Sequence, residues 1–191
     1  MSFENKQRGV SLIEVLITLI LISIGLLGTA ALQVFSKQAN YEAAQRTSAA
    51  HLTNDLFQRM RSNRSVLEGY LPANDLGVGS LGETPDKDCG VGTCTTAEIA
   101  SYDLWHWEQQ LDGASETVGG ANAGGLLEPT VCIDGPAGGG DGIYEVAISW
   151  RGQAAHINPI INDCGEGSGK YGDDDEFRHV LIMQTFIQVG V

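Results

Sequence analysis

The sequence has 191 residues, of which 42% are hydrophobic and 18% are charged, and its formal net charge is −13. This length accommodates one long helix and one modest globular domain. The charge is unevenly distributed, because residues 65–191 hold 20 Asp and Glu against four Lys and Arg. Such an acidic surface repels nucleic-acid phosphates, so the composition excludes nucleic acid from the expected partners.

An uncharged run near the N-terminus, Val15 to Ser36, dominates the first part of the chain. As a helix these 22 residues would be about 33 Å long, enough to cross the hydrocarbon core of a bilayer. Lys6 and Arg8 precede the run, so the positive-inside rule places the leader in the cytoplasm and the remainder outside it. An uncleaved signal anchor would explain these features equally well.

Glu14 is not explained by a simple membrane anchor. It lies within an otherwise apolar stretch, Val10 to Ser36. An ionised carboxylate at mid-membrane depth costs up to about 3 kcal/mol. We therefore expect Glu14 to have a positively charged partner.

The segment Gly9-Val10-Ser11-Leu12-Ile13-Glu14-Val15-Leu16 resembles the leader of type IV pilins and pseudopilins. In that family a short basic leader ends in Gly, and a Glu follows five residues into the mature chain. The resemblance implies that a prepilin peptidase cleaves after Gly9 and methylates the new N-terminus at Val10, where the family more often has Phe. It also implies that the helix is first a membrane anchor and then filament core. Glu14 would act in assembly by pairing with the α-ammonium group of Val10, in its own chain or in a neighbour.

We expect four segments. These are a leader peptide at 1–9, a transmembrane and assembly helix at 10–36, an amphipathic helix extension at 37–67 and a globular periplasmic head at 68–191. No proline interrupts residues 11–66, which favours one continuous helix to about Val66. An apolar stripe on the extension, formed by Ala49, Leu52, Leu56 and Met60 at helical spacing, is suited to contact the head. The charges of Arg59, Arg61 and Arg64 are interpreted as a solvated face near the helix C-terminus.

All four cysteines, Cys89, Cys94, Cys132 and Cys164, lie in the part expected to be exported. An even number in an oxidising compartment predicts two disulfides. A zinc site is the alternative, but the gaps between these cysteines do not match paired zinc knuckles. Of the three possible pairings we prefer a local Cys89–Cys94 link and a longer Cys132–Cys164 link.

The head is predicted to combine one helix with a small antiparallel sheet. Thr95 or Thr96 can cap a helix that extends to about Leu111, with Ala100, Leu104, Trp107 and Leu111 on one stripe. Three segments predict strands, namely Thr130 to Ile133, an alternating run from Tyr144 to Arg151 and an alternating run from Leu181 to Ile187. The predicted fold class is α+β, with a long N-terminal helix and a glycine-rich head stapled by disulfides.

The start of the head adds a second resemblance. Cys89-x4-Cys94 is followed by Ile99-Ala100, Tyr102-Asp103-Leu104 and Trp105, and a later strand ends in Trp150. This pattern is similar to the head of minor pilins of the type IV pilus modification protein PilV family. It implies a minor pilin that takes part in initiation, assembly or tip formation of a type IV pilus, and hence in adhesion and twitching motility.

Several other motifs contain residue types that are found in ligand sites. Trp105, His106 and Trp107 are too divergent on a helix to form one flat sugar-binding surface. The four histidines show no ligand spacing, so no catalytic residue is assigned. Asp173 to Glu176 could bind calcium, but the run lacks the usual ligand spacing and favours a solvated turn. We expect no metal and no cofactor.

The leading hypothesis is therefore a non-enzymatic minor pilin, anchored in the inner membrane by one span and later placed at the pilus tip. Its expected partners are a prepilin peptidase, other minor pilins, the major pilin and the inner membrane, with a tip adhesin as a further candidate. One alternative is a minor pseudopilin of a type II secretion system. A membrane-anchored periplasmic enzyme is a third hypothesis, which the absence of any recognisable hydrolase or protease signature disfavours.

Overall fold

In a computed structural model, the described residues are 9, 11–114, 117–122 and 124–189. They divide into two compact units, Met1–Tyr41 and Glu42–Val191. Helix α1 (Leu12–Ser62) begins in the first unit and ends in the second. A helix of 51 residues is possible because no proline removes a backbone donor anywhere along it.

The second unit contains the other helices and all the strands. The 3₁₀ helix η1 spans Arg64–Tyr70 and α2 spans Thr96–Leu111, while η2 is a short turn at Ala137–Gly139. The strands are β1 (Leu76–Gly77), β2 (Thr117–Val118), β3 (Ala121–Asn122), β4 (Thr130–Asp134), β5 (Gly142–Arg151) and β6 (Arg178–Ile187). The predicted α+β class is confirmed.

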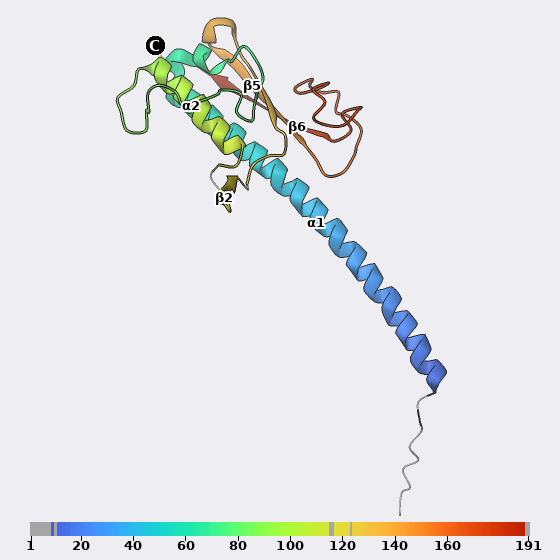
Figure 1. The fold of residues 1–191 in the computed structure, drawn as a ribbon. Helices are drawn as coiled ribbons and strands as arrows, with labels where there is room; N and C mark the ends of the chain where they lie inside the picture. Colours follow the sequence, from blue (N-terminus) through green and yellow to red (C-terminus); the bar gives the residue numbers. More distant parts are fainter. Residues whose placement is uncertain (1–8, 10, 115–116, 123, 190–191) are drawn as a thin grey trace, which may run out of the picture. The chain divides into compact units, whose positions relative to one another are not determined.

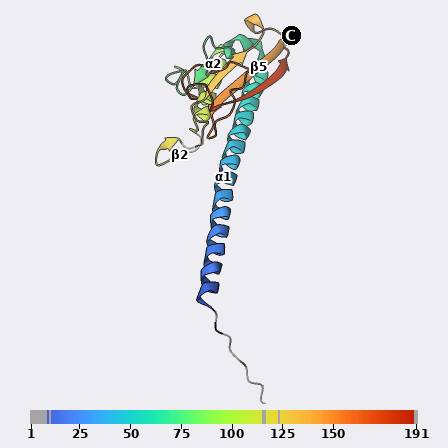
Figure 2. The same ribbon diagram turned by 90° about the vertical axis from the view of Figure 1, so that its right-hand side faces the viewer.

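The main sheet is antiparallel and has the strand order β1-β4-β5-β6. Strands β2 and β3 form a separate two-stranded ribbon. The sheet and α2 lie beside the part of α1 that belongs to this unit (Figures 1 and 2). The three longer strands were predicted, whereas β1, β2 and β3 have two residues each, too few to show an alternating pattern.

The core of this unit lies between the two helices and one face of the sheet. It contains Ala49, Leu56 and Met60 from α1, and Leu52 packs against it with partial burial. The stripe predicted on the helix extension is thus confirmed. Helix α2 contributes its predicted stripe of Ala100, Leu104, Trp107 and Leu111, and β5 contributes Tyr144, Val146, Ile148 and Trp150.

Helix α2 begins where the sequence indicates. Thr95 is its N-cap, with its hydroxyl accepting a 3.3 Å hydrogen bond from the backbone N–H of Glu98. The Glu98 carboxylate in turn accepts a 2.7 Å bond from the Thr95 N–H, which completes a capping box. The pKa of Glu98 is lowered first by this backbone hydrogen bond and then by a hydrogen bond from the side chain of Lys87. Both bonds favour the ionised carboxylate.

Two features of the fold differ from the predictions. Helix α1 ends at Ser62 rather than near Val66, because Asn63 leaves helical geometry and its side-chain amide donates a 2.7 Å bond to the carbonyl of Thr96. Strand β5 is buried on both faces, since the outward-facing Ala147 and Ser149 are also buried, whereas an alternating run is typical of a strand buried on one face. The segment 152–177 covers them, with the Tyr171 hydroxyl 3.1 Å from that of Ser149.

Candidate functional site

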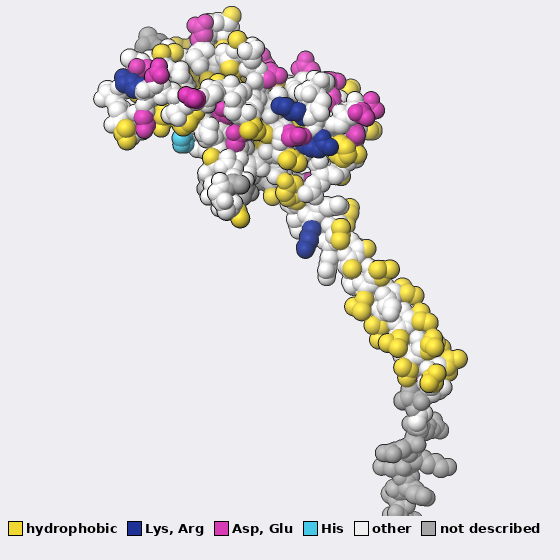
Figure 3. Space-filling model, in the orientation of Figure 1, with side chains coloured by type: hydrophobic (Ala, Val, Ile, Leu, Met, Phe, Trp, Pro, Cys, Tyr) yellow, Lys and Arg dark blue, Asp and Glu magenta, His cyan; other side chains and the backbone are white. Residues whose placement is uncertain are grey.

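The first unit consists of the initial turns of α1, whose side chains form an apolar cylinder. Every large apolar side chain from Leu12 to Phe35 is exposed, and apolar atoms cover the visible face of this segment (Figure 3). Among the described residues α1 is the one helix long and apolar enough to cross a membrane, with a mean hydropathy of 2.5 over its most apolar stretch. Such a surface is costly in water and suited to lipid or to the apolar helices of neighbouring subunits.

Three hydroxyl groups on this cylinder are satisfied within the helix. The hydroxyls of Thr18, Ser23 and Thr29 donate to backbone carbonyls three or four residues earlier, at 2.7–2.9 Å. A hydroxyl paired in this way adds little cost in hydrocarbon. These three hydroxyls therefore do not prevent apolar groups from surrounding the helix.

Glu14 lies in the first turn of α1, at the positive end of the helix dipole. Its backbone N–H donates a 3.0 Å bond to the carbonyl of Ser11. Within the described residues, no hydrogen bond or ion pair reaches its carboxylate. The proposed partner, the α-ammonium group of a cleaved chain at Val10, lies outside the described residues.

Gly9, the residue expected to precede the cleavage site, is described. A side chain placed there would meet no atom within 4 Å, and its backbone does not require a positive φ. As far as the described residues show, glycine is therefore not needed at position 9 for packing. Val10 is not described, so the geometry of the bond between the two residues lies outside the structure.

Both preferred disulfides are present in the second unit. Cys89–Cys94 closes a small loop before α2, and Cys132–Cys164 connects β4 to the segment that covers the outer face of β5. Their Cα–Cα distances are 5.7 and 5.8 Å, within the usual range. The prediction of a head stapled by two disulfides is confirmed, and no free cysteine remains among the described residues.

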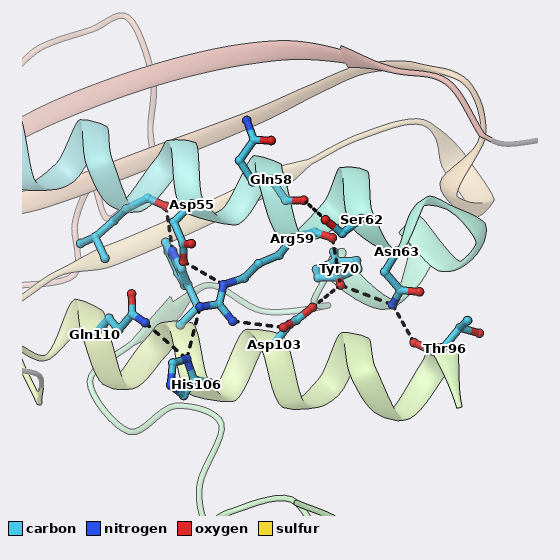
Figure 4. Close-up of polar contacts among 12 residues, drawn as sticks. Asp55, Gln58, Arg59, Ser62, Asn63, Tyr70, Thr96, Asp103, His106 and Gln110 are labelled. Carbon is cyan, nitrogen blue, oxygen red and sulfur yellow. Dashed lines mark hydrogen bonds and ion pairs between the residues drawn. The ribbon is translucent and has the colours of Figure 1, made fainter. Parts of the chain in front are cut away.

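The junction between α1 and α2 corrects the interpretation of Arg59 as a solvated charge. Its side chain is only 19% exposed and bonds to Asp55 at 2.8 Å and to Asp103 at 3.1 Å. A further contact of 3.3 Å joins it to Nδ1 of His106 (Figure 4). Arg59 is therefore a structural link between the helices, whereas Arg61 and Arg64 are exposed, as predicted.

The aromatic cluster of α2 is divided between the core and the surface, as the helical geometry predicts. Trp107 is fully buried, and its indole N–H donates a 2.8 Å bond to the carbonyl of Leu52 on α1. Trp105 is partly exposed and lies beside Tyr102, with ring centroids 5.9 Å apart. The two tryptophans do not form one ligand-binding surface.

Two histidines lie in contact, although their spacing in the sequence does not predict it. The rings of His156 and His179 have centroids 4.3 Å apart, and His179 also stacks on Trp150, with centroids 5.8 Å apart. Burial, followed by the charge of His156, lowers the pKa of His179, because both oppose its protonated form. The fold of segment 152–177 creates this contact, and no sequence spacing could have predicted it.

The acidic run 173–176 takes part in hydrogen bonds within its own loop. Asp175 accepts a 2.8 Å bond from the N–H of Gly167, and Glu176 accepts a 3.2 Å bond from the N–H of Asp174. Among the described residues, no group of three or more His, Cys, Asp or Glu side chains is placed to hold a metal ion. These observations assign the run a local structural role.

Comparison with known proteins connects these features to one class of protein. Residues 5–30 match the prokaryotic N-terminal methylation motif. Residues 31–105 match the family described as type IV pilin Tt1218. No curated protein and no solved structure matches the chain significantly. The two matched segments, which contain Gly9, Glu14, the whole of α1 and most of α2, are those of a type IV pilin with an N-methylation leader.

Proposed function

We propose that this chain, a type IV pilin with an N-methylation leader, acts as a minor pilin in the initiation, assembly or tip of a type IV pilus. One observation carries the proposal: an exposed apolar helix starts at Leu12 with a carboxylate, Glu14, in its first turn. The likeness of residues 89–105 to minor pilins of the PilV type supports the narrower role. The type IV pilin family is structural rather than enzymatic.

In this proposal the chain is first inserted in the inner membrane. A prepilin peptidase cleaves between Gly9 and Val10 and methylates Val10, while Lys6 and Arg8 hold the leader in the cytoplasm. The acidic head is then periplasmic. That compartment permits disulfides, which fits the two present in this unit.

The role proposed for Glu14 follows from electrostatics in a medium of low dielectric constant. A lone carboxylate is expensive there, whereas a carboxylate paired with an ammonium group is tolerable. When a subunit leaves the bilayer, its Glu14 can pair with the α-ammonium group at Val10 of a neighbour. This pairing would fix the stagger between adjacent helices.

The test replaces Glu14 with Ala in the full chain. We expect a cleaved protein that stays in the membrane, fewer pili, less twitching and less copurification with other minor pilins. The matched control is Thr18→Val. Thr18 lies one turn further along the same helix, and its hydroxyl already donates a hydrogen bond to the carbonyl of Val15. It should leave all three measurements unchanged.

Two results would contradict the proposal. If Glu14→Ala cells keep normal piliation, twitching and copurification, the assembling role is wrong. If instead protein secretion falls while pili are unaffected, the chain is a pseudopilin of a secretion system.

A further inference from the structure

The surface of the second unit carries an apolar projection that its own fold leaves uncovered. Ile157, Ile160 and Ile161 are 92%, 96% and 73% exposed. Single exposed apolar residues are ordinary, but three isoleucines this exposed within five positions concentrate apolar surface on one short segment. We call the segment 157–161 the isoleucine loop.

The isoleucine loop is held in place by a buried arginine. Arg178, at the start of β6, is fully buried, and its guanidinium group donates to the carbonyls of Pro159, Asn162 and Cys164 at 2.6–2.9 Å. It also donates a 2.8 Å bond to the side chain of Asn158. Two of these four hydrogen bonds are to Asn158 and Pro159 of the isoleucine loop, and two are to Asn162 and Cys164 just beyond it. The buried charge therefore holds both the loop and the residues that follow it in place.

Covalent and backbone contacts fix the two ends of the same loop. On its C-terminal side, Cys164 is bonded to Cys132 of β4. On its N-terminal side, the N–H of His156 donates a 2.7 Å bond to the carbonyl of Glu176. Because the loop is already ordered, docking its isoleucines costs little further conformational entropy.

The charge around the loop indicates what could cover it. Asp163 and Glu166 are exposed just beyond the isoleucines, and residues 42–191 hold 22 acidic against eight basic side chains, a formal net charge of −14. Acidic side chains are spread over the visible face of this unit (Figure 3). This charge repels both a second copy of the unit and an anionic lipid surface, and it attracts a basic surface.

We propose that the isoleucine loop docks into an apolar recess, rimmed by Lys and Arg side chains, on a different pilin subunit. The isoleucines supply the apolar area, and Asp163 supplies charge complementarity at the rim. This inference deepens the proposed function, on which it rests, by naming the surface and the chemistry of the partner.

The test uses the full chain in its native cells, with Glu14 unaltered. A photo-crosslinking amino acid, p-benzoylphenylalanine, replaces Ile160, whose nearly complete exposure allows the change without loss of packing. The same replacement at Val91, 89% exposed in the Cys89–Cys94 loop, is the matched control. Mobility on a non-reducing gel checks that both variants have formed their disulfides.

After irradiation we expect position 160, and not position 91, to form an adduct with another processed pilin. The adduct site should lie in an apolar segment flanked by Lys or Arg. In washed membranes, raising the salt should weaken the adduct, and Asp163→Lys should reduce it by about threefold. Asp86→Lys, the same charge change at an exposed position near the control loop, should not.

Several outcomes would overturn the proposal. They are an adduct with a second copy of this chain, an adduct with lipid alone, equal adducts from both positions, no adduct, or an adduct insensitive to salt and to Asp163→Lys. If position 160 forms no adduct while the cells keep normal pili, the docking surface is wrong and the proposed function is unaffected. If Glu14→Ala cells still form the adduct and still make normal pili, the proposed function is wrong and the docking surface is unaffected.

Discussion

The hydroxyl of Tyr70 donates a 2.6 Å hydrogen bond to Asp103, which lies 33 residues further along the chain. The other carboxylate oxygen of Asp103 accepts a bond from Arg59 (Figure 4). Burial, followed by the bond to Asp103, raises the pKa of the Tyr70 hydroxyl well above its ordinary value, because both disfavour the phenolate. One carboxylate on α2 thus fixes the end of α1 and the turn that follows it.

The first prediction concerns this junction. Arg59→Ala leaves Asp103 and Asp55 without their cation in a partly buried site, so the free energy of unfolding should fall by about 2 kcal/mol. For a unit of this size the melting temperature should fall by about 4–8 °C. Thermal unfolding of the purified chain in detergent measures the shift.

Arg64→Ala is the matched control, because Arg64 is exposed and lies only five residues away. Its effect should be about 0.5 kcal/mol or less. Equal losses in the two variants would show that the ion pairs of Arg59 contribute no more than a surface charge.

Arg59 also illustrates what could not be predicted from the sequence. Its spacing from Arg61 and Arg64 suggested a solvated cluster, because the partner that buries it is 44 residues away in the chain. Local signals were more reliable. The N-cap, predicted at Thr95 or Thr96 and observed at Thr95, and the stripe that ends at Leu111 both depend on neighbouring residues.

The outer face of β5 shows the same limit. The alternation from Tyr144 to Arg151 correctly predicted a strand and the side chains that enter the core. It could not show that Ala147 and Ser149 are buried too, since a glycine-rich segment without periodicity covers them. The predicted assembly residues Gly9, Val10 and Glu14 depend on a motif, and their roles remain predictions.

The two disulfides should differ in their contribution to stability. In the chain-entropy model, the stabilisation grows with the length of the closed loop. Cys132 and Cys164 are separated by 32 residues, and Cys89 and Cys94 by five. Replacing both members of the long link with Ser should cost about 4 kcal/mol, and replacing both members of the short link about 2 kcal/mol. Denaturant unfolding of the two double variants provides the comparison, and a larger loss from the short link would contradict it.

His179 should make the stability of the head depend on pH. Burial and the adjacent His156 lower its pKa in the folded state, with Glu42 acting in the opposite sense and Arg46 in the same sense. The unfolded chain therefore binds a proton near pH 6.5 while the folded chain resists it. Stability is retained above that pH and falls as the pH decreases through the lowered pKa of the folded state.

His179→Phe keeps a ring against Trp150 but cannot take up a proton. The decrease in melting temperature between about pH 7.5 and pH 5 should therefore be smaller in this variant than in the unaltered chain. His51→Phe, on the exposed face of α1, is the control and should keep the original dependence. An unchanged pH profile in His179→Phe would show that other groups cause the decrease.

The last prediction concerns the cleavage expected between Gly9 and Val10. Intact-mass measurement of the membrane-extracted protein should show a chain that begins at Val10 and carries one added methyl group. Gly9→Val should keep the full leader. A side chain at position 9 would meet no atom of the described part of the chain within 4 Å, so this loss of cleavage would report recognition by the peptidase and not a change in folding. Gly25→Ala, equally free of contacts within the helix, should be cleaved normally. An unaltered chain that still begins at Met1, or a Gly9→Val chain that is processed, would remove the basis for assigning a prepilin leader.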